Sequence, residues 1–297
     1  MITIFSVPKP FWGHIGIIQR NAIQSWTRLY PDCEIILCGD DVGAKEAAVD
    51  FKTKYIPDID RNEYGTPLLN FVFEQVERIA SYPLLCYVNA DVILMSNFIL
   101  AVQSIPFQKF LMVGQRWDIN LAEPLNFETD EWKEQLQKYV FMNGSLHPPA
   151  GSDYFVFPRG IIGKLPPFAV GRPGWDNWFI YRARSLGIPV IDATRVVTAI
   201  HQNHDYAHVK QATDGASEGP EAEDNRKLIG GWEYFFTIRD ATHHLTPASS
   251  IPTGSAFCLR RNLRTLPVPA LKVYKKLEYI TGAGMRALKG RLHLKHE

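Results

Sequence analysis

The chain of 297 residues has few cysteines, almost no net charge and no long apolar run. Its four cysteines form no C-x-x-C pair, which argues against a disulfide framework and against a cysteine zinc site. The net charge of +1 gives no reason to expect nucleic acid as a partner. No apolar run approaches the roughly 20 residues that span a bilayer, and the N-terminus lacks signal-peptide features. We therefore expect a cytoplasmic protein, peripheral to a membrane at most.

The first half of the chain alternates strand-like and helix-like segments. The strand-like runs are Ile2–Val7, Glu34–Leu37 and Leu84–Val88, and the helix-like ones are Ile15–Leu29, Gly43–Phe51 and Leu68–Ile79. This alternation predicts an α/β fold with a mostly parallel central sheet flanked by helices. Ligands of such sheets bind at the carboxyl ends of the strands, which directs attention to Lys9, Asp40 and Asn89–Asp91.

The second half of the chain is less regular. We expect strands at 110–113, 153–157, 188–191 and 195–200, and helices at 131–139 and 176–185. The segment 211–225 is polar and rich in glycine and acids, which predicts a mobile loop. We assign residues 1–245 to a catalytic domain and residues 246–297 to a Pro-rich segment followed by a basic helical tail.

The triplet Asn89-Ala90-Asp91 follows an apolar run and stands at an expected strand end. A lone acid there is often only a turn former. At the carboxyl edge of a parallel sheet, however, a carboxylate can hold a divalent cation against a diphosphate. Asp91 is therefore a candidate metal ligand.

Histidines cluster in the segment His201–His208, which reads His-Gln-Asn-His-Asp-Tyr-Ala-His. Imidazole and carboxylate groups so close together favour a metal-binding or catalytic role for at least one histidine. The alternative is a polar surface turn. The pair His243-His244 is a weaker candidate with a structural alternative.

Two further acids stand beside aromatic residues. In Gly174-Trp175-Asp176-Asn177-Trp178, Asp176 is either a helix N-cap or a general base, and Trp175 is either core or an apolar platform for a sugar. Asp153 begins an expected strand and is a candidate site residue.

Taken in order, these segments resemble the GT-A-fold glycosyltransferases, the nucleotide-diphospho-sugar transferase superfamily, and in particular its bacterial-type enzymes. The resemblance covers about residues 1–245. It rests on Ser6–Phe11, Gln19–Trp26, Gly39-Asp40, Tyr87–Asp91, Ser152–Phe155, Gly174–Trp178 and His201–His208. The family has an Asp-x-Asp metal motif, whose first acid is here Asn89.

The resemblance implies a site for Mn²⁺ or Mg²⁺ formed by Asp91 with His201 or His204. It implies a nucleotide-sugar donor bound by Lys9, Asp40, Asn89 and Asp91. The acid that activates the acceptor hydroxyl falls on Asp176, and we expect Asp153 and Trp175 to contact the acceptor.

The function expected from this resemblance is transfer of a sugar from a nucleotide-diphosphate sugar, UDP-linked, to a glycan or lipid-linked hydroxyl in polysaccharide biosynthesis. Alternatives are a catalytically silent nucleotide-sugar or glycan-binding protein, a metal-dependent hydrolase built on His201, His204, Asp205 and His208, and a nucleotidyltransferase. The basic tail from Leu271 to Glu297 either contacts an anionic membrane surface or packs as a solvated helix.

Overall fold

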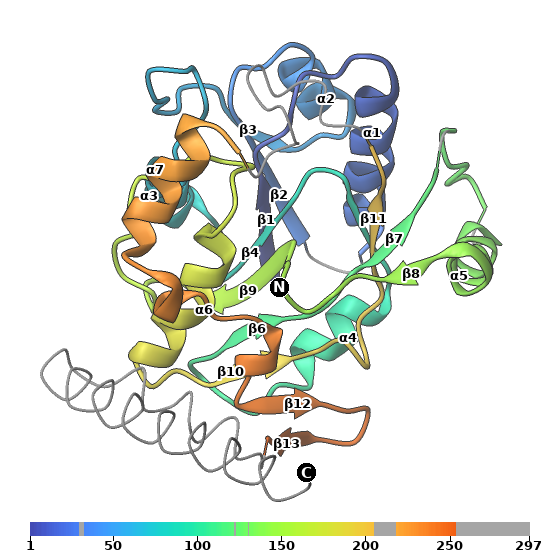
Figure 1. Cartoon of the computed structure of the whole chain (residues 1–297). Helices are drawn as coiled ribbons and strands as arrows, with labels where there is room; N and C mark the ends of the chain where they lie inside the picture. Colours follow the sequence, from blue (N-terminus) through green and yellow to red (C-terminus); the bar gives the residue numbers. More distant parts are fainter. Residues whose placement is uncertain (30–32, 122, 130, 205–217, 254–297) are drawn as a thin grey trace, which may run out of the picture. The chain divides into compact units, whose positions relative to one another are not determined.

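The computed structural model describes residues 1–29, 33–121, 123–129, 131–204 and 218–253 (Figure 1). Met1–Thr253 forms one compact unit. The expectations for Asp205 and His208, for residues 211–217 of the polar segment and for the basic tail lie outside the described residues. The loop predicted at 211–225 is wrong over its last six residues, which form the start of the helix Pro220–Ile229. Within the described ranges, no helix is both long and apolar enough to cross a membrane.

A large central sheet organises the fold, with nine strands among the described residues. In spatial order they are β13 (Ser250–Pro252), β12 (His243–Leu245), β10 (Val190–Asp192), β6 (Leu111–Val113), β9 (Tyr154–Pro158), β4 (Leu84–Val88), β1 (Ile2–Ser6), β2 (Cys33–Cys38) and β3 (Lys54–Ile56). Most pairs are parallel, but β9 is antiparallel to β4 and β6, and β13 to β12. The predicted mostly parallel sheet is confirmed.

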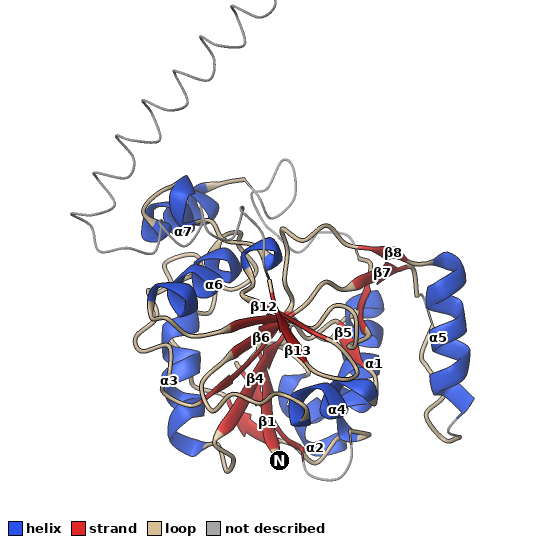
Figure 2. Cartoon of the chain, turned by 90° about the horizontal axis from the view of Figure 1, so that it is seen from below, coloured by secondary structure: helices blue, strands red, loops and turns tan. Residues whose placement is uncertain are grey.

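Helices cover both faces of this sheet (Figure 2). The helices among the described residues are α1 (Gly13–Thr27), α2 (Ala44–Asp50), α3 (Leu69–Ile79), α4 (Asn97–Gln103), α5 (Glu131–Asn143), α6 (Trp175–Ser185) and α7 (Pro220–Ile229). Of these, α5 packs against the smaller sheet described below. Helices α3 and α6 pack on one face, and α1, α2 and α4 on the other. The mixed α/β architecture with flanking helices agrees with the expectation from the sequence.

Successive side chains of the central strands pack alternately into two separate hydrophobic cores, one on each face of the sheet. In β1, Phe5 packs with α3 and α6, whereas Ile4 packs with α1 on the opposite face. In β4, Tyr87 packs in the same core as Phe5, and Cys86 packs in the same core as Ile4. Because both faces are covered, the strands read as continuous apolar runs, which is why the sequence reveals them.

A smaller sheet lies beside the central one, in the order β5 (Val92–Leu94), β11 (Ala199–Gln202), β7 (Trp117–Ile119) and β8 (Ser145–Leu146). In β11, His201 is in register with both Val92 and Asp118. The expected strand 195–200 is wrong at its start. Val196 and Val197 each donate a backbone hydrogen bond of 2.9 Å to the carbonyl of Ala193, which makes a turn there.

The hairpin of β12 and β13 extends the central sheet to Pro252. The sheet therefore continues past residue 245, where we expected the catalytic domain to end. Two 3₁₀ turns, Trp232–Tyr234 and Ile238–Asp240, connect α7 to this hairpin.

Candidate active site

Several loops meet where β1 and β4 end. These two strands are parallel, and β9 is antiparallel to β4, so the chain after β1, after β4 and before β9 reaches one edge of the sheet. A cavity of about 390 Å³ opens there. The predicted site residues that line it are Lys9, Asn89, Asp91, Asp153, Trp175, Asp176, His201 and His204. Asp40, which we expected to bind the donor, is not part of the lining, and neither are the weaker candidates His243 and His244.

Asp91, His201 and His204 form a group with the geometry of a metal site. One ligand atom from each residue lies within 4.8 Å of the other two. The Asp91 Oδ2 atom is 3.1 Å from His204 Nε2, and Lys9 Nζ lies 3.4 Å from the same oxygen. Among the described residues, the other oxygen, Asp91 Oδ1, is buried without a hydrogen-bond partner. A bound cation would satisfy this oxygen.

The neighbours of Asp91 keep its buried carboxyl group ionised. Burial raises the pKa of this carboxyl, but Lys9, His204 and His201 together lower it well below its usual range. Asp91 is therefore an anion, although it is only 6% exposed. A buried anion next to two imidazoles is suited to binding a divalent cation, whereas the Lys9 ammonium group competes with such a cation for the same oxygen.

A buried amide fixes the backbone around Asp91. Gln202 donates from Nε2 to the Asp91 carbonyl at 3.0 Å and to the Ile18 carbonyl at 2.8 Å. Asn21 in turn donates to Gln202 Oε1 at 3.0 Å. Helix α1, strand β11 and the loop after β4 are thus tied together. Gln202 lies within the histidine-rich segment that the sequence singled out, but its role depends on partners distant in the chain.

Arg116 pairs with Asp153, the acid that we expected to contact the acceptor. The guanidinium group of Arg116 pairs with Asp153 and donates from Nε to Asp118 Oδ1 at 2.9 Å. Asn89 donates from Nδ2 to the other oxygen of Asp153 at 2.9 Å. Both carboxylate oxygens of Asp153 are therefore engaged by the chain itself. The predicted acceptor contact of Asp153 stays a prediction, and the structure shows that Asp153 links Arg116 to Asn89.

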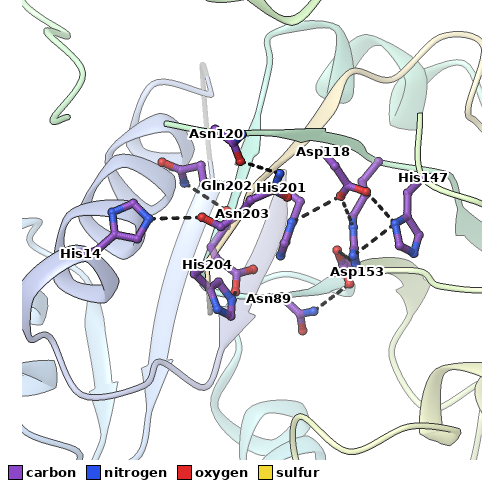
Figure 3. A network of polar contacts seen from close by, with 12 residues as sticks. His14, Asn89, Asp118, Asn120, His147, Asp153, His201, Gln202, Asn203 and His204 are labelled. Carbon is purple, nitrogen blue, oxygen red and sulfur yellow. Dashed lines mark hydrogen bonds and ion pairs between the residues drawn. The ribbon is translucent and has the colours of Figure 1, made fainter. Parts of the chain in front are cut away.

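A second carboxylate lies behind His201 (Figure 3). Asp118 Oδ2 is 2.7 Å from His147 Nδ1, and Asp118 Oδ1 is 3.4 Å from His201 Nδ1. Burial raises the pKa of Asp118, but His201, Arg116 and His147 lower it below the usual range. Burial lowers the pKa of His201, but Asp118 and other acids raise it overall. Sequence reasoning missed Asp118, Arg116 and His147, because each stands alone in the chain with no motif around it.

Asp176 lies in the first turn of α6, at the edge of the cavity. The N-cap position is held by Gly174, so the alternative interpretation of Asp176 as the N-cap is wrong. Gly174 has a φ of +100°, and a Cβ there would lie 2.2 Å from Ile229. Burial, with a contribution from Asp153, raises the pKa of Asp176 to about 6, although backbone N–H groups lower it in part. This carboxylate is a better base than an ordinary aspartate.

Trp175 serves the core and the cavity at once. It is 6% exposed, and its ring lies 5.0 Å from Tyr87 and 4.9 Å from Phe155, between ring centroids. It also lines the cavity. The core interpretation therefore holds, and the predicted contact with a sugar face stays a prediction.

Asp40 lies outside the cavity, and its neighbour Asp41 lines it instead. Arg61 links the two, with its guanidinium 2.6 Å from Asp40 and 2.9 Å from Asp41. The Asp40 side chain is 67% exposed. Arg172, which also lines the cavity, pairs with Glu221 of α7. The cavity wall thus contains cationic side chains that the sequence analysis did not identify.

No family model matches the chain, and no curated protein is similar to it in sequence. The chain resembles solved GT-A glycosyltransferases in fold. One is S. aureus TarS 1–349 in complex with UDP-GlcNAc, at 11% identity and a TM-score of 0.46, with 77% of this chain and 64% of that chain covered. A second is glucosyl-3-phosphoglycerate synthase from Mycobacterium tuberculosis with phosphoglyceric acid, at 12% identity and a TM-score of 0.43, with 77% and 79% covered.

A third similar structure is GalNAc-T7 with UDP, GalNAc and Mn²⁺, at 14% identity and a TM-score of 0.49, with 79% of this chain and 49% of that chain covered. The chain spans less than two thirds of the TarS fragment and about half of GalNAc-T7. These similarities concern the arrangement of helices and strands. What the chain does has to be argued from the side chains of its own cavity.

Proposed function

We propose that this chain is a glycosyltransferase that moves a sugar from a nucleotide-diphosphate sugar, with UDP as the expected nucleotide, to a hydroxyl of a glycan or lipid-linked acceptor. The observation that carries this proposal is the convergence of Asp91, His201 and His204 with Asp176 around one cavity. In such a transfer the leaving diphosphate gains negative charge and the acceptor hydroxyl loses a proton. A cation-binding group and a base on one cavity meet both needs.

Asp91, His201 and His204 would hold the divalent cation, Mn²⁺ or Mg²⁺. One carboxylate and two imidazoles can hold Mn²⁺, although this donor set also suits Fe²⁺ and Zn²⁺ and suits Mg²⁺ less well, and the unpaired buried Asp91 Oδ1 supports a bound cation. When bound, the cation supplies positive charge that stabilises the departing diphosphate. Lys9, whose Nζ lies 3.4 Å from Asp91, adds a fixed cationic group at the same position.

Asp176 would accept the proton of the acceptor hydroxyl. Its pKa of about 6 leaves it ionised at neutral pH and gives it more proton affinity than an exposed aspartate. Asn89 would orient the donor. Its amide nitrogen is bonded to Asp153, so its amide oxygen is the group left to accept a hydrogen bond from a donor hydroxyl.

The most informative experiment needs no knowledge of the acceptor. The full chain is incubated with a panel of nucleotide sugars and Mn²⁺, and release of free nucleotide diphosphate by slow donor hydrolysis is measured. We expect one donor to be hydrolysed, with the activity lost on adding EDTA. Release from no donor, together with clear binding of a nucleotide sugar, would identify a silent binding protein. Cleavage of model phosphoesters without any sugar donor would identify a hydrolase.

A further inference from the structure

The antiparallel pair of strands β7 and β8 places a polar layer next to His201. Asp118 lies in β7 and His147 directly after β8 (Figure 3), and Arg116 directly precedes β7. Asp118 pairs in register with both His201 and Ser145, so its position relative to β11 is set by the smaller sheet. No residue of this layer belongs to the group of Asp91, His201 and His204, which could hold a metal.

The carboxylate of Asp118 is fixed from two sides before it reaches His201. His147 Nδ1 lies 2.7 Å from Oδ2, and Arg116 Nε donates to Oδ1 at 2.9 Å. His147 is itself anchored, because its carbonyl accepts a hydrogen bond of 2.6 Å from Gln115. Two groups thus prevent the carboxylate from rotating, and Oδ1 stays directed toward His201 Nδ1, 3.4 Å away.

This arrangement gives the two nitrogens of the His201 ring different surroundings. Nδ1 is buried and makes no hydrogen bond within the part of the chain that the structure describes, and Asp118 Oδ1, 3.4 Å away, is the carboxylate oxygen placed to accept one. Nε2 is then the nitrogen left for the group formed with Asp91 and His204. A neutral imidazole binds a metal only through the nitrogen that lacks a proton. Metal-binding histidines almost always donate their other N–H to a carboxylate, a carbonyl or water, and loss of that partner typically weakens metal binding about 10- to 100-fold.

We propose that Asp118 is a positioning residue: it accepts the Nδ1–H of His201 and so keeps the Nε2 lone pair directed at Asp91 and His204. Arg116 and His147 hold Asp118 in this position. The inference rests on the proposed metal site, and it adds a residue that acts through His201 rather than on the cation or the sugar. The side chain of Asp118 is 19% exposed, so its charge is partly desolvated and its contacts are correspondingly strong.

Asp118→Asn is the informative substitution. The amide has nearly the same shape, and with its NH₂ group toward His201 it donates to Nδ1 and stabilises the tautomer that carries the proton on Nε2, the nitrogen needed for the cation. An asparagine in place of a histidine-orienting aspartate is known to impose the wrong tautomer in this way. With the amide reversed, its oxygen keeps the hydrogen bond from Arg116 Nε and still faces His201. Asp118→Leu, which has no acceptor in any orientation, therefore accompanies Asp118→Asn in the NMR test.

The first test requires no metal. Nitrogen-15 NMR of the histidine side chains reports which ring nitrogen carries the proton, and His201→Gln identifies the signal of His201. At pH 8.5 in EDTA, we expect a single Nδ1–H form in the wild-type chain and a shift toward Nε2–H in Asp118→Asn. An unchanged His201 signal in both Asp118→Asn and Asp118→Leu would overturn the proposal, whatever the outcome of any metal measurement.

The second test is calorimetric titration of the full chain with MnCl₂. We expect Asp118→Asn to weaken Mn²⁺ binding about 10- to 100-fold. Asp50→Asn is the matched control, because it makes the same chemical change in an exposed ion pair with Arg20, and its Mn²⁺ affinity should equal that of the wild type. Equal affinities for all three chains would refute the positioning role. Absence of Mn²⁺ binding to the wild type would instead refute the proposed metal site and leave the NMR test to decide this inference.

A double-mutant cycle then separates positioning from a general effect of charge. If Asp118 acts through His201, Asp118→Asn should have little further effect on Mn²⁺ affinity in a His201→Ala chain. A full additional loss in that background would show that Asp118 acts by another route.

Circular dichroism and thermal unfolding of each variant check that the fold persists. Asp118→Glu, which keeps the charge, is a second variant, and its Mn²⁺ affinity is expected to fall between those of the wild type and Asp118→Asn.

Discussion

Two histidine–aspartate pairs in this molecule have the same nitrogen–oxygen distance but different surroundings. His204 Nε2 lies 3.1 Å from Asp91 Oδ2, and His244 Nδ1 lies 3.1 Å from Asp192 Oδ2. The His204 side chain is 3% exposed, whereas the His244 side chain is 39% exposed. The first pair lines the cavity at the ends of β1 and β4, and the second joins β12 to β10.

The two pairs differ in the number of further side chains that approach the aspartate. His201 and Lys9 also approach Asp91, and the group with His201 is the one cluster of three potential metal ligands found among the described residues. Asp192 instead uses its other oxygen to accept hydrogen bonds from the backbone and hydroxyl of Thr194. A histidine–aspartate contact can therefore belong to a metal-binding group or can simply link two neighbouring strands. Burial and the presence of further potential ligands distinguish the first case from the second.

The largest effect is expected for Asp91→Asn. We expect Mn²⁺ binding to be lost and donor hydrolysis to fall about a thousandfold, because the cavity loses the anion that holds the cation. Calorimetry and nucleotide release measure the two effects. If Asp192→Asn reduced both quantities as much, the contrast between the two pairs would be wrong.

Asp176→Asn should reduce sugar transfer about a hundredfold or more, since the acceptor loses its base. Binding of nucleotide and Mn²⁺ should be unchanged. In the wild-type chain, the base must be ionised, and its pKa is raised to about 6, so the rate should fall as the pH drops through about 6. A pH–rate profile tests this, and the residual activity of Asp176→Asn should lack that acidic limb. Retention of the limb in the variant would assign it to another group.

Asn89→Asp restores the Asp-x-Asp pattern of the GT-A resemblance but should destabilise this chain. The new carboxylate would take the place of an amide that donates to Asp153 at 2.9 Å, so two like charges would meet. Arg116 offsets part of the repulsion. We expect a loss of about 1 kcal/mol in the free energy of unfolding at pH 7.5 with EDTA.

The pH dependence of this loss has a defined sign. The repulsion requires both carboxyls to be ionised, so the loss is present at neutral pH and disappears as one of them becomes protonated at acidic pH. Urea unfolding at pH 7.5 and pH 4 measures it. An equal difference at both pH values would show that the cost has a cause other than charge.

The smallest effect is expected for Asp192→Asn. The His244–Asp192 contact is partly exposed, and such pairs contribute about 0.5 kcal/mol or less. Asparagine keeps an oxygen that can accept the hydrogen bonds from Thr194. Thermal unfolding should change little, and Mn²⁺ affinity should match the wild type. A large drop in Mn²⁺ affinity would mean that the two pairs are coupled.

The buried strands and amphipathic helices were predictable because their patterns are local. β1 and β4 are apolar throughout since both faces are covered, and α1 repeats its buried residues at helical spacing. Strands β7 and β8 were missed. They are three and two residues long and mostly polar, which is too short for a periodic signal.

Asp91, Asp176 and the histidines could be proposed from the sequence, because each stands in a recognisable segment at the end of a strand or the start of a helix. Arg116, Asp118 and His147 could not. Their importance comes from contacts with Asp153 and His201, which are remote in the chain. The same limit applies to Asp40 and Asp41, where neighbouring acids differ only in which one reaches the cavity.

The α/β architecture and the candidate acids and histidines at the ends of the strands follow from the amino-acid sequence, because apolar periodicity and residue type are properties of short segments. The tertiary structure decided which acids are ionised, which are held by arginine, and which histidine nitrogen faces the ligand group. These depend on burial and on distances of a few ångströms between β4, β7, β9, β11 and α6, and no short segment contains that information.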